Sequence, residues 1–385
     1  FHILGDHGAL VLYPIAWLSG FFPSVTFLFV IQGAALASAV FPLTKLASQN
    51  HLSKRSLVTS LSVLFLYPIV FNSAIFDFHP EVLAFPLICE ALVILKNSNQ
   101  NYYWRAFVYL LLSLTCKINI SFLIFGIGGW LIICKKRNIG AALVSMSIVW
   151  FVSIGGFLIP AFGGEGAHIT RQAGKFGIEP GSIFDIQQTP SIIIQLFRQV
   201  LSLSNIEYIL LILIPVAYVV LHKYRNRIIF NLTPFLPVFV LNIVATASTM
   251  KDLVHHYSLL LVPFLAVEVL LSLAPGDKGI LGYPTWMQRK GYLIILSWAI
   301  LTFIIFSRLT FYFGAFQDRL SNAQERREAI ELINPQSALL TSNDLVPHLS
   351  HRKVIVSIGQ YSEGLDSFDE ILLDLSQPGW GSDIK

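Results

Sequence analysis

The sequence predicts a polytopic α-helical membrane protein with about ten spanning helices, followed by a small extramembrane α/β domain. Two observations lead to this fold class. Hydrophobic residues make up 55% of the 385-residue chain and charged residues only 12%, whereas soluble domains carry roughly 25% charged residues. The apolar residues also form continuous runs rather than an alternating pattern, and in lipid a continuous run satisfies its backbone polar groups as a helix.

A helix needs roughly 20 apolar residues to cross about 30 Å of hydrocarbon. The segment 8–22 is apolar but contains Pro14 and Gly20, and we expect an interfacial or re-entrant helix there. Residues 1–311 form the predicted transmembrane domain. We expect its spanning helices at residues 24–46, 56–76, 81–96, 105–116, 119–134, 139–161, 206–221, 228–247, 256–274 and 291–311.

The region 105–134 allows two interpretations, one long helix or a tight hairpin with Lys117 at its tip. One helix would place Arg105 and the basic run 135–137 on opposite sides of the membrane. A hairpin places both on the same side, which the bias of basic residues toward one side favours. We therefore predict the hairpin, whose short arms neighbouring helices or thinned lipid must shield.

Basic residues predict the sidedness of the chain, because cytoplasmic loops carry an excess of Lys and Arg. Five short connections hold 14 of the 26 basic residues: Lys45, Lys54, Arg55, Lys96, Arg105, Lys135, Lys136, Arg137, Lys223, Arg225, Arg227, Lys278, Arg289 and Lys290. We predict that these connections are cytoplasmic and that both ends of the chain lie outside. The net charge of +4 then reflects topology, and we expect membrane lipid rather than nucleic acid as a partner.

Two long regions are predicted on the outer side, the loop 163–205 and the tail 312–385. The loop contains TPSIIIQLFRQVLS (189–202), whose apolar period indicates a helix along the membrane surface. In the tail, residues 322–333 predict an amphipathic helix with Asn322 as its N-cap. Three strand-like runs accompany this helix, at 337–342, 353–358 and 370–375, and the mixture of strands and helix predicts a small α/β domain.

The motif FDFHPE joins two predicted spans and contains Asp77, His79 and Glu81 within five residues. Ionisable groups at the membrane boundary usually line a cavity or mark a function. These three side chains offer acid–base groups, or ligands for a divalent cation. The alternative is helix capping, with Asp77 as the cap, Pro80 opening the next helix and Glu81 facing its dipole.

A second polar motif on the predicted outer face is GDH, which contains Asp6 and His7. A third is MKDLVHHYS, which carries Asp252, His255 and His256. Asp252 and His256 are four residues apart and share one face if this stretch is helical, so the motif is a candidate metal site. Snorkelling and capping explain the same residues equally well.

Two isolated cations complete the candidate site on this face. Lys117 at the hairpin tip could bind a phosphate as a point charge, or it could be a snorkelling lysine. Arg171 in the outer loop is a second candidate for phosphate binding. The polar residues thus converge on one predicted face, which favours an interfacial active site over a transport pathway, because a transporter should show ionisable or helix-breaking residues near the middle of several spans.

The strings GDHGALVLYPIAWL, FDFHPEVLAFPL, CKINISFLIFGIGGWLI, WFVSIGGFLIPAFGG, HHYSLLLVPFLA and SNDLVPHLSHR resemble the bacterial membrane-protein family called domain of unknown function 2079, within the GT-C superfamily of glycosyltransferases. The resemblance runs in order over nearly the whole chain. It implies the inner (plasma) membrane, a polyprenyl-phosphate-linked sugar as donor, and an Asp or Glu base in the first outer loop. It also allows a divalent metal, Mg²⁺ or Mn²⁺, without making any cofactor certain.

This chain departs from the family pattern in two places. It starts at Phe1 rather than Met, so we expect that an N-terminal piece with most of the first outer loop is missing and that Asp6 belongs to the end of that loop. After Lys117 the family often has acidic residues, but Ile118 and Asn119 follow here. An acidic role for this hairpin is therefore in doubt, whereas Lys117 keeps its candidate role toward phosphate.

The first functional hypothesis is a GT-C-like transferase. Asp77 or Asp6 would act as the base, and the remaining residues would bind substrate: His79, Glu81, Lys117, Arg171 and His7. The alternatives are a lipid or glycolipid transporter or flippase, and a non-catalytic membrane scaffold. The sequence does not indicate the sugar, the acceptor or the oligomeric state.

Overall fold

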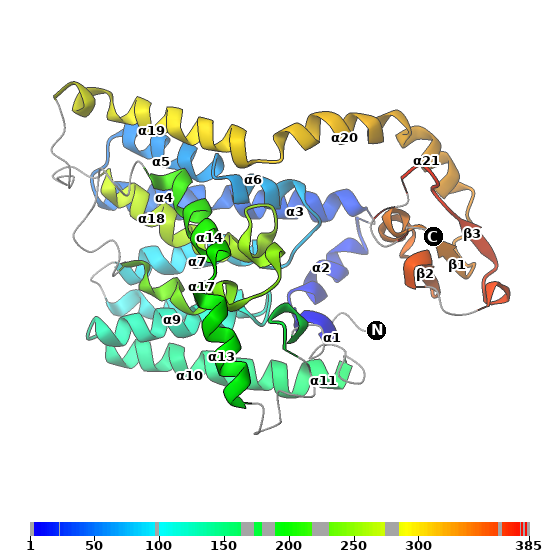
Figure 1. Ribbon diagram of the computed structural model, residues 1–385, viewed down its shortest axis with the longest axis horizontal. Coiled ribbons are helices and arrows are strands. Elements are labelled where there is room, and N and C mark those ends of the chain that lie inside the picture. The colour runs from blue at the N-terminus through cyan, green and yellow to red at the C-terminus, as the bar shows by residue number, and fades with distance from the viewer. Residues whose placement is uncertain are drawn as a thin grey trace. The chain divides into compact units, whose positions relative to one another are not determined.

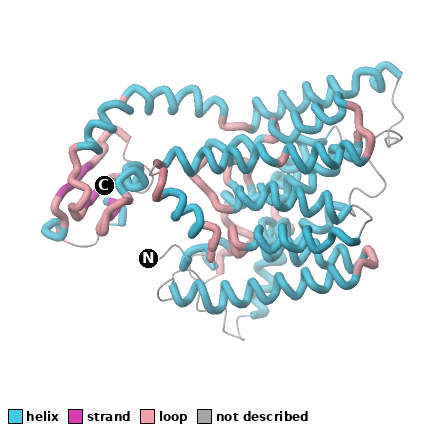
Figure 2. Tube along the Cα trace, turned by 180° about the vertical axis from the view of Figure 1, so that it is seen from behind, coloured by secondary structure: helices cyan, strands magenta, loops and turns pink. Residues whose placement is uncertain are grey.

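The computed structural model describes residues 4–22, 24–96, 100–162, 173–178, 189–217, 231–273, 285–360, 364–377, 379 and 382. The chain divides into two compact units. The first comprises Phe1–Leu18 and Phe29–Arg308, and the second comprises Ser19–Leu28 and Leu309–Lys385. Helices make up most of the described chain, and its strands belong to the second unit (Figures 1 and 2).

The elements before Arg308 are all helical. In chain order they are α1 (Leu4–His7), α2 (Leu12–Ser19), α3 (Val25–Ser38), α4 (Val40–Gln49), α5 (Lys54–Phe65), α6 (Pro68–Ile75), α7 (Glu81–Lys96), η1 (Gln100–Tyr102), α8 (Tyr103–Leu114), α9 (Ile120–Ile133), α10 (Arg137–Ser153), η2 (Ile154–Leu158), α11 (Ile159–Phe162), α13 (Thr189–Val200), α14 (Leu203–Leu213), η4 (Ile214–Val216), η5 (Thr233–Phe235), α17 (Leu236–Val244), η6 (Ser248–Lys251), η7 (His256–Leu261), α18 (Val262–Ser272) and α19 (Thr285–Phe306).

Three helical stretches among the described residues are long and apolar enough to cross a membrane: Val25–Gln49, Arg137–Phe162 and Ser248–Ser272. The number rises to six if each of three bent helix pairs forms one span. The expectation of about ten spans is therefore not confirmed. One reason is that α7 has 16 residues, which gives a rise of about 24 Å, short of the roughly 30 Å of hydrocarbon.

Proline residues account for part of the shortening. Residues 56–76 were expected to be one span, but the chain forms α5 and α6, which meet at 53°. Pro68 is the first residue of α6, a position where its missing N–H breaks no helical hydrogen bond. Pro215 is the second residue of the 3₁₀ turn η4 (Ile214–Val216), which follows α14. Parts of the expected spans 206–221, 228–247 and 256–274 lie outside the described residues.

The predicted break at Lys117 is confirmed, because α8 ends at Leu114 and α9 begins at Ile120. The next helix, α10, lies alongside α9 (Figure 1), after a turn in which Lys135 has a φ of 64°. Gly128 of α9 and Gly140 of α10 allow the two backbones to approach closely. A Cβ added at Gly128 would lie 2.8 Å from the Gly140 carbonyl oxygen.

Burial separates the central helices of the first unit from its peripheral ones. Of the most apolar stretch of Ser248–Ser272, 83% is buried, and every residue of α18 is buried. The corresponding values are 28% for Val25–Gln49 and 22% for Arg137–Phe162. An apolar helix with most of its surface uncovered is suited to lipid, whereas α18 is enclosed by other helices.

The two segments that we expected at the membrane surface are both helical. Residues 189–202 contain α13, where Ile193, Ile194 and Phe197 are more than half exposed. Within 8–22 the helix is α2, whose eight residues rise about 12 Å. Since this length is far below that of a span, α2 is compatible with either an interfacial or a re-entrant segment.

From Leu309 on, the described part of the second unit contains two α-helices, three 3₁₀ helices and a three-stranded parallel sheet of order β2-β1-β3. The elements are α20 (Leu309–Ser321), α21 (Ala323–Glu331), β1 (Leu339–Thr341), η8 (Asn343–Leu349), β2 (Ile355–Ser357), η9 (Ile358–Gln360), η10 (Leu365–Ser367) and β3 (Glu370–Leu372). Each predicted strand run contains one of these strands, and the predicted helix 322–333 contains α21. Leu339, Leu345 and Leu349 form the small core of this unit.

The predicted capping role of Asn322 is wrong. Its side chain makes no capping hydrogen bond, and its backbone angles are φ −106° and ψ 12°, whereas an N-cap residue is usually extended. The reason is that α20 ends at Ser321, directly before Asn322, so the chain does not enter α21 from an extended segment. The Asn322 carboxamide oxygen instead accepts a hydrogen bond from the Ser321 hydroxyl at 3.2 Å.

We predict that Gly128→Ala destabilises the first unit by about 1–3 kcal/mol, the usual effect of overpacking, because the new methyl group meets backbone atoms of α10. Gly129→Ala is the matched control, since a Cβ there has no atom within 4 Å. Thermal unfolding of the purified variants in detergent gives the comparison. Equal melting temperatures for the two variants would contradict close packing between α9 and α10.

Candidate functional site

The candidate site lies where three connections of the first unit meet. One joins α6 to α7 and leads to Glu81, the first residue of α7. The second joins α8 to α9 and carries Lys117, and the third leads into η7, which begins at His256. All three side chains are at least 93% buried. The fold therefore brings together residues that are up to 175 positions apart in the sequence.

Glu81, Lys117 and His256 form a triangle of short contacts. Lys117 Nζ donates to Glu81 Oε1 at 2.6 Å, and His256 Nε2 lies 3.0 Å from the same oxygen. Lys117 Nζ and His256 Nε2 are 3.2 Å apart. A buried carboxylate and a buried ammonium are stable only when they are paired and hydrogen-bonded. The contacts therefore lock the three connections to one another.

Two polar atoms of this triangle have no hydrogen-bond partner among the described residues. They are Glu81 Oε2 and His256 Nδ1, and both are buried. Such orphaned atoms are rare in folded proteins and call for an explanation. Here they give the triangle one further acceptor and one further ring nitrogen with which to bond the polar group of a ligand.

His79 extends the triangle toward the surface. Its ring lies against that of His256, with centroids 3.7 Å apart, and its Nδ1 is 2.6 Å from the Asp77 carbonyl oxygen. Because a carbonyl oxygen only accepts, Nδ1 carries the hydrogen and donates it. Burial lowers the pKa of His79, outweighing the opposite effect of Glu81. His79 is thus neutral near pH 7, with the Nε2 lone pair available as an acceptor.

Two amide side chains that sequence reasoning missed hold these connections in place. Gln32 of α3 is fully buried. It donates to the Ser73 and Phe76 carbonyl oxygens at 2.9 and 3.1 Å and accepts from the His79 N–H at 3.1 Å. Asn72 donates to the Leu253 carbonyl oxygen at 2.7 Å. For Gln32, the available signal in the sequence was a single glutamine within the apolar run 24–46.

Asp77 is exposed, and its carboxylate has no hydrogen-bond or ion-pair partner among the described residues. Helix capping alone does not describe the FDFHPE motif, because Asp77 makes no capping bond and the Glu81 carboxylate contacts Lys117. Asp6 pairs with His7 at 3.3 Å. The His7 carbonyl oxygen accepts from the Ile118 N–H at 3.3 Å, so α1 lies against the connection that carries Lys117.

The MKDLVHHYS motif divides between two environments. His256 enters the buried triangle, whereas Asp252 pairs with His255 at 2.7 Å. Asp252 Oδ1 also accepts hydrogen bonds from the Val254 and His255 N–H groups at 3.0 and 2.9 Å. These bonds stabilise a local turn of the backbone. Residues 252–255 are not helical, so the condition for Asp252 and His256 to share a helical face is not met.

No group of three His, Cys, Asp or Glu side chains in the described ranges is arranged to hold a metal ion. Asp252 and His255 direct their polar atoms at each other, and His256 faces Glu81. These donors therefore do not fit a divalent-metal site as they stand. A metal at Asp252, His255 and His256 stays a prediction from the sequence.

A second cation lies close to the triangle. Lys175 donates to the Tyr257 hydroxyl at 3.4 Å, and its amine also lies 5.1 Å from the centre of that ring. Lys117 contacts the Tyr257 ring at 5.7 Å, so the ring lies near both cations. Arg171, the predicted phosphate ligand, lies outside the described residues.

We predict that Lys117→Met and Glu81→Gln each destabilise the protein by about 3–5 kcal/mol, since each leaves a buried polar partner unpaired. The double variant should lose clearly less than the sum of the two. Lys45→Met is the control, because the Lys45–Glu90 pair has the same 2.6 Å distance but a half-exposed lysine, and its loss should be within about 1 kcal/mol. Additive losses in thermal unfolding would contradict the buried pair.

A pH prediction follows from His79, whose pKa is lowered in the folded chain relative to about 6.5 in the unfolded chain. Below about pH 6.5 the unfolded state binds a proton that the folded state lacks, so stability falls as the pH drops toward the folded pKa. His79→Gln should reduce this loss between pH 8 and pH 5, measured as melting temperature. Parallel curves for wild type and variant would exclude this contribution of His79.

Comparison with known proteins places this arrangement in a family. Residues 1–385 match the family described as "Predicted membrane protein (DUF2079)". No curated protein and no solved structure matches the chain. The apolar helices, three to six of which qualify as membrane spans among the described residues, agree with that description. From the match over its whole length, the chain belongs to the DUF2079 family of predicted membrane proteins.

Proposed function

We propose that the protein is a GT-C-like membrane glycosyltransferase that takes a sugar from a polyprenyl-phosphate donor at the non-cytoplasmic face. The observation that carries the proposal is the environment of Asp77. Its carboxylate is exposed and has no partner among the described residues, and its own backbone carbonyl holds the neighbouring His79 ring. An exposed carboxylate beside a neutral imidazole is suited to general base chemistry on a sugar hydroxyl.

In the proposed reaction the oxygen of the acceptor hydroxyl attacks the anomeric carbon of the donor sugar. At the same time the Asp77 carboxylate accepts the proton of that hydroxyl. The bond between that carbon and the phosphate oxygen breaks, and polyprenyl phosphate leaves with the bonding electrons. A correctly placed general base contributes typically 10²–10⁴-fold to the rate.

The buried triangle supports this role by positioning and by binding. It holds the connection that carries Asp77, and Glu81 Oε2 together with His79 Nε2 offers acceptors for sugar hydroxyl groups. Lys117 is already paired with Glu81. Its role toward the donor is therefore a positive electrostatic potential rather than direct binding of the phosphate. Lys175, which is less buried, is the better placed of these two cations to contact the donor phosphate.

We expect Asp77→Asn to lower sugar transfer at least a hundredfold without loss of folded protein, because the amide cannot accept the proton. The assay uses proteoliposomes containing radiolabelled polyprenyl-phosphate glucose with a membrane extract as the source of acceptors. Asp366→Asn, at an exposed carboxylate of the second unit, serves as the matched control and should keep full activity.

Full activity of Asp77→Asn would remove Asp77 from the reaction. If the wild-type protein moves the labelled donor across the bilayer without consuming it, the protein is a glycolipid transporter instead. Survival of transfer after substitution of Asp77, together with its loss on deletion of 312–385, would favour a scaffold that works through its second unit.

A further inference from the structure

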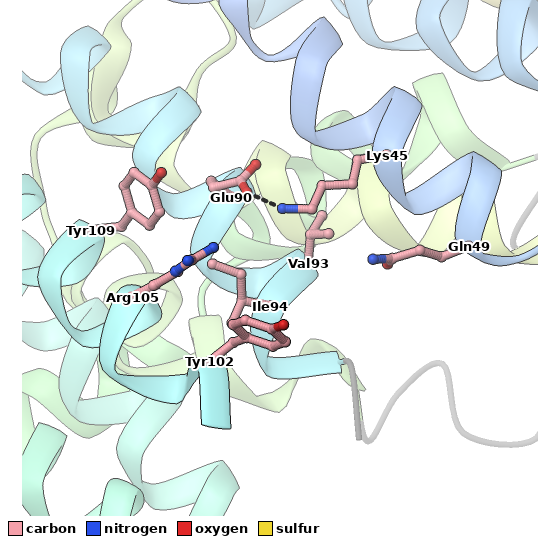
Figure 3. A pocket seen from close by; sticks show the side chains of 8 residues that line it. All are labelled: Lys45, Gln49, Glu90, Val93, Ile94, Tyr102, Arg105 and Tyr109. Carbon is pink, nitrogen blue, oxygen red and sulfur yellow. Dashed lines mark hydrogen bonds and ion pairs between the residues drawn. The ribbon is translucent and has the colours of Figure 1, made fainter. Parts of the chain in front are cut away.

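A cavity of about 330 Å³ opens between three helices of the first unit, far from the candidate site. Glu81 and Glu90 are nine residues apart on α7, which separates the cavity from the buried triangle by about 13 Å along the helix. The lining residues come from α4, α7, η1 and the first seven residues of α8: Lys45, Gln49, Glu90, Val93, Ile94, Tyr102, Arg105 and Tyr109 (Figure 3).

The charges of the cavity do not balance. Lys45 and Arg105 are positive and Glu90 is negative, and Figure 3 shows both cationic side chains extending toward Glu90. Lys45 forms an ion pair with Glu90 at 2.6 Å. Arg105 has no carboxylate partner among the described residues and lies over the rings of Tyr102 and Trp104 at 5.1 and 5.5 Å. The cavity therefore keeps one uncompensated positive charge.

The group that best complements this cavity is a phosphate. A guanidinium presents a planar fork of N–H donors that matches two phosphate oxygens, and it is more weakly hydrated than an ammonium. The Gln49 amide and the Tyr109 hydroxyl line the same cavity and supply further donors. An anion that contacts Arg105 would also be attracted by Lys45.

The surface beside the cavity shows which kind of phosphate fits. Phe41 lies one helical turn before Lys45 on α4 and is 76% exposed. Val108 and Leu112 follow Arg105 by three and seven residues on α8 and are 40% and 48% exposed. Residues at this spacing share a helical face, so apolar side chains continue from the cavity toward the start of α4 and toward the end of α8. An amphiphile matches this arrangement, because its anionic head would lie in the basic cavity and its apolar chain along the apolar side chains beside the cavity.

Other groups near this end of α7 resemble those found at a membrane–water interface. Lys96, the last residue of α7, pairs with Glu268 at 2.6 Å. Lys136 donates to the Leu95 carbonyl oxygen at 2.8 Å and lies 4.8 Å from the centre of the Tyr103 ring. Basic and aromatic side chains gather where helices leave the hydrocarbon, and basic clusters there attract anionic lipids.

We propose that this cavity binds the phosphate head group of an anionic membrane lipid, with Arg105 as the main ligand and Lys45 as the second. The site is separate from the proposed sugar-transfer site and does not depend on that function. The lipid's acyl chains lie along the face formed by Phe41, Val108 and Leu112.

The test measures lipid retained by the purified protein after reconstitution in nanodiscs of equal parts phosphatidylglycerol and phosphatidylcholine, followed by detergent extraction and native mass spectrometry. The wild type should keep phosphatidylglycerol in clear preference. Arg105→Gln should lower this retention about tenfold, as expected for loss of a charged hydrogen bond. Arg105→Lys, which keeps the charge but loses the fork, should fall between the two.

Lys54→Gln is the matched control, because Lys54 is an exposed cation at the start of α5 and does not line the cavity. It should leave the preference unchanged. Equal losses in Lys54→Gln and Arg105→Gln would overturn the proposal, since they would show a general effect of net charge. Binding of inorganic phosphate by lipid-free protein, sensitive to Arg105→Gln and without retention of phosphatidylglycerol, would overturn the lipid as the source of the phosphate.

Discussion

The ion pair between Glu81 and Lys117, joined by His256, is the interaction on which the rest of the candidate site depends. Each partner comes from a different connection, and each is almost completely removed from water. A charge in such a place is tolerated only while its partner remains, so the three connections keep their relative positions together. The exposed Asp77 and the neutral His79 are presented on a connection that this contact and Gln32 hold.

This arrangement separates positioning from chemistry. The buried charges of Glu81 and Lys117 pair with each other and hold the connections in place. The neighbouring groups that remain accessible, the Asp77 carboxylate and the His79 Nε2, are those suited to proton transfer and to hydrogen bonds with hydroxyl groups. This division is what the proposed sugar transfer would require, because its base would meet a polar acceptor while the donor is largely apolar.

The sequence predicted the elements that depend on local pattern. The break at Lys117, the surface helix containing Phe197 and the three strand runs of the second unit were all predicted from periodicity or charge. The predicted span 56–76 is bent by 53° between α5 and α6, because Pro68 starts a new helix within an otherwise apolar run. The prediction of about ten spans is not confirmed, and local bends of this kind are not visible in hydropathy alone.

The sequence allowed us to predict which residues belong to the candidate site, but not which of them contact one another. Glu81, Lys117 and His256 were each selected as polar residues on one face, yet nothing in the spacing indicated that they contact one another, because long-range contacts have no local signature. The same limit explains why Asp252 and His256 were joined as metal ligands although the chain directs them to different partners. Gln32 was missed because a single amide in a long apolar run cannot be distinguished from a polar residue that occurs there by chance.

The placement of two polar centres on α7 restricts how this helix can change in length. Glu81 belongs to one centre and Glu90 to the other, and a helix turns by about 100° and rises 1.5 Å for each residue. Inserting or deleting one residue between them would swing one carboxylate to another side of the helix while its partners stayed behind. The interval of nine residues therefore fixes both the distance and the relative direction of the two carboxylates. Only an insertion or deletion of three or four residues, about one helical turn, would return both carboxylates to their original sides of the helix.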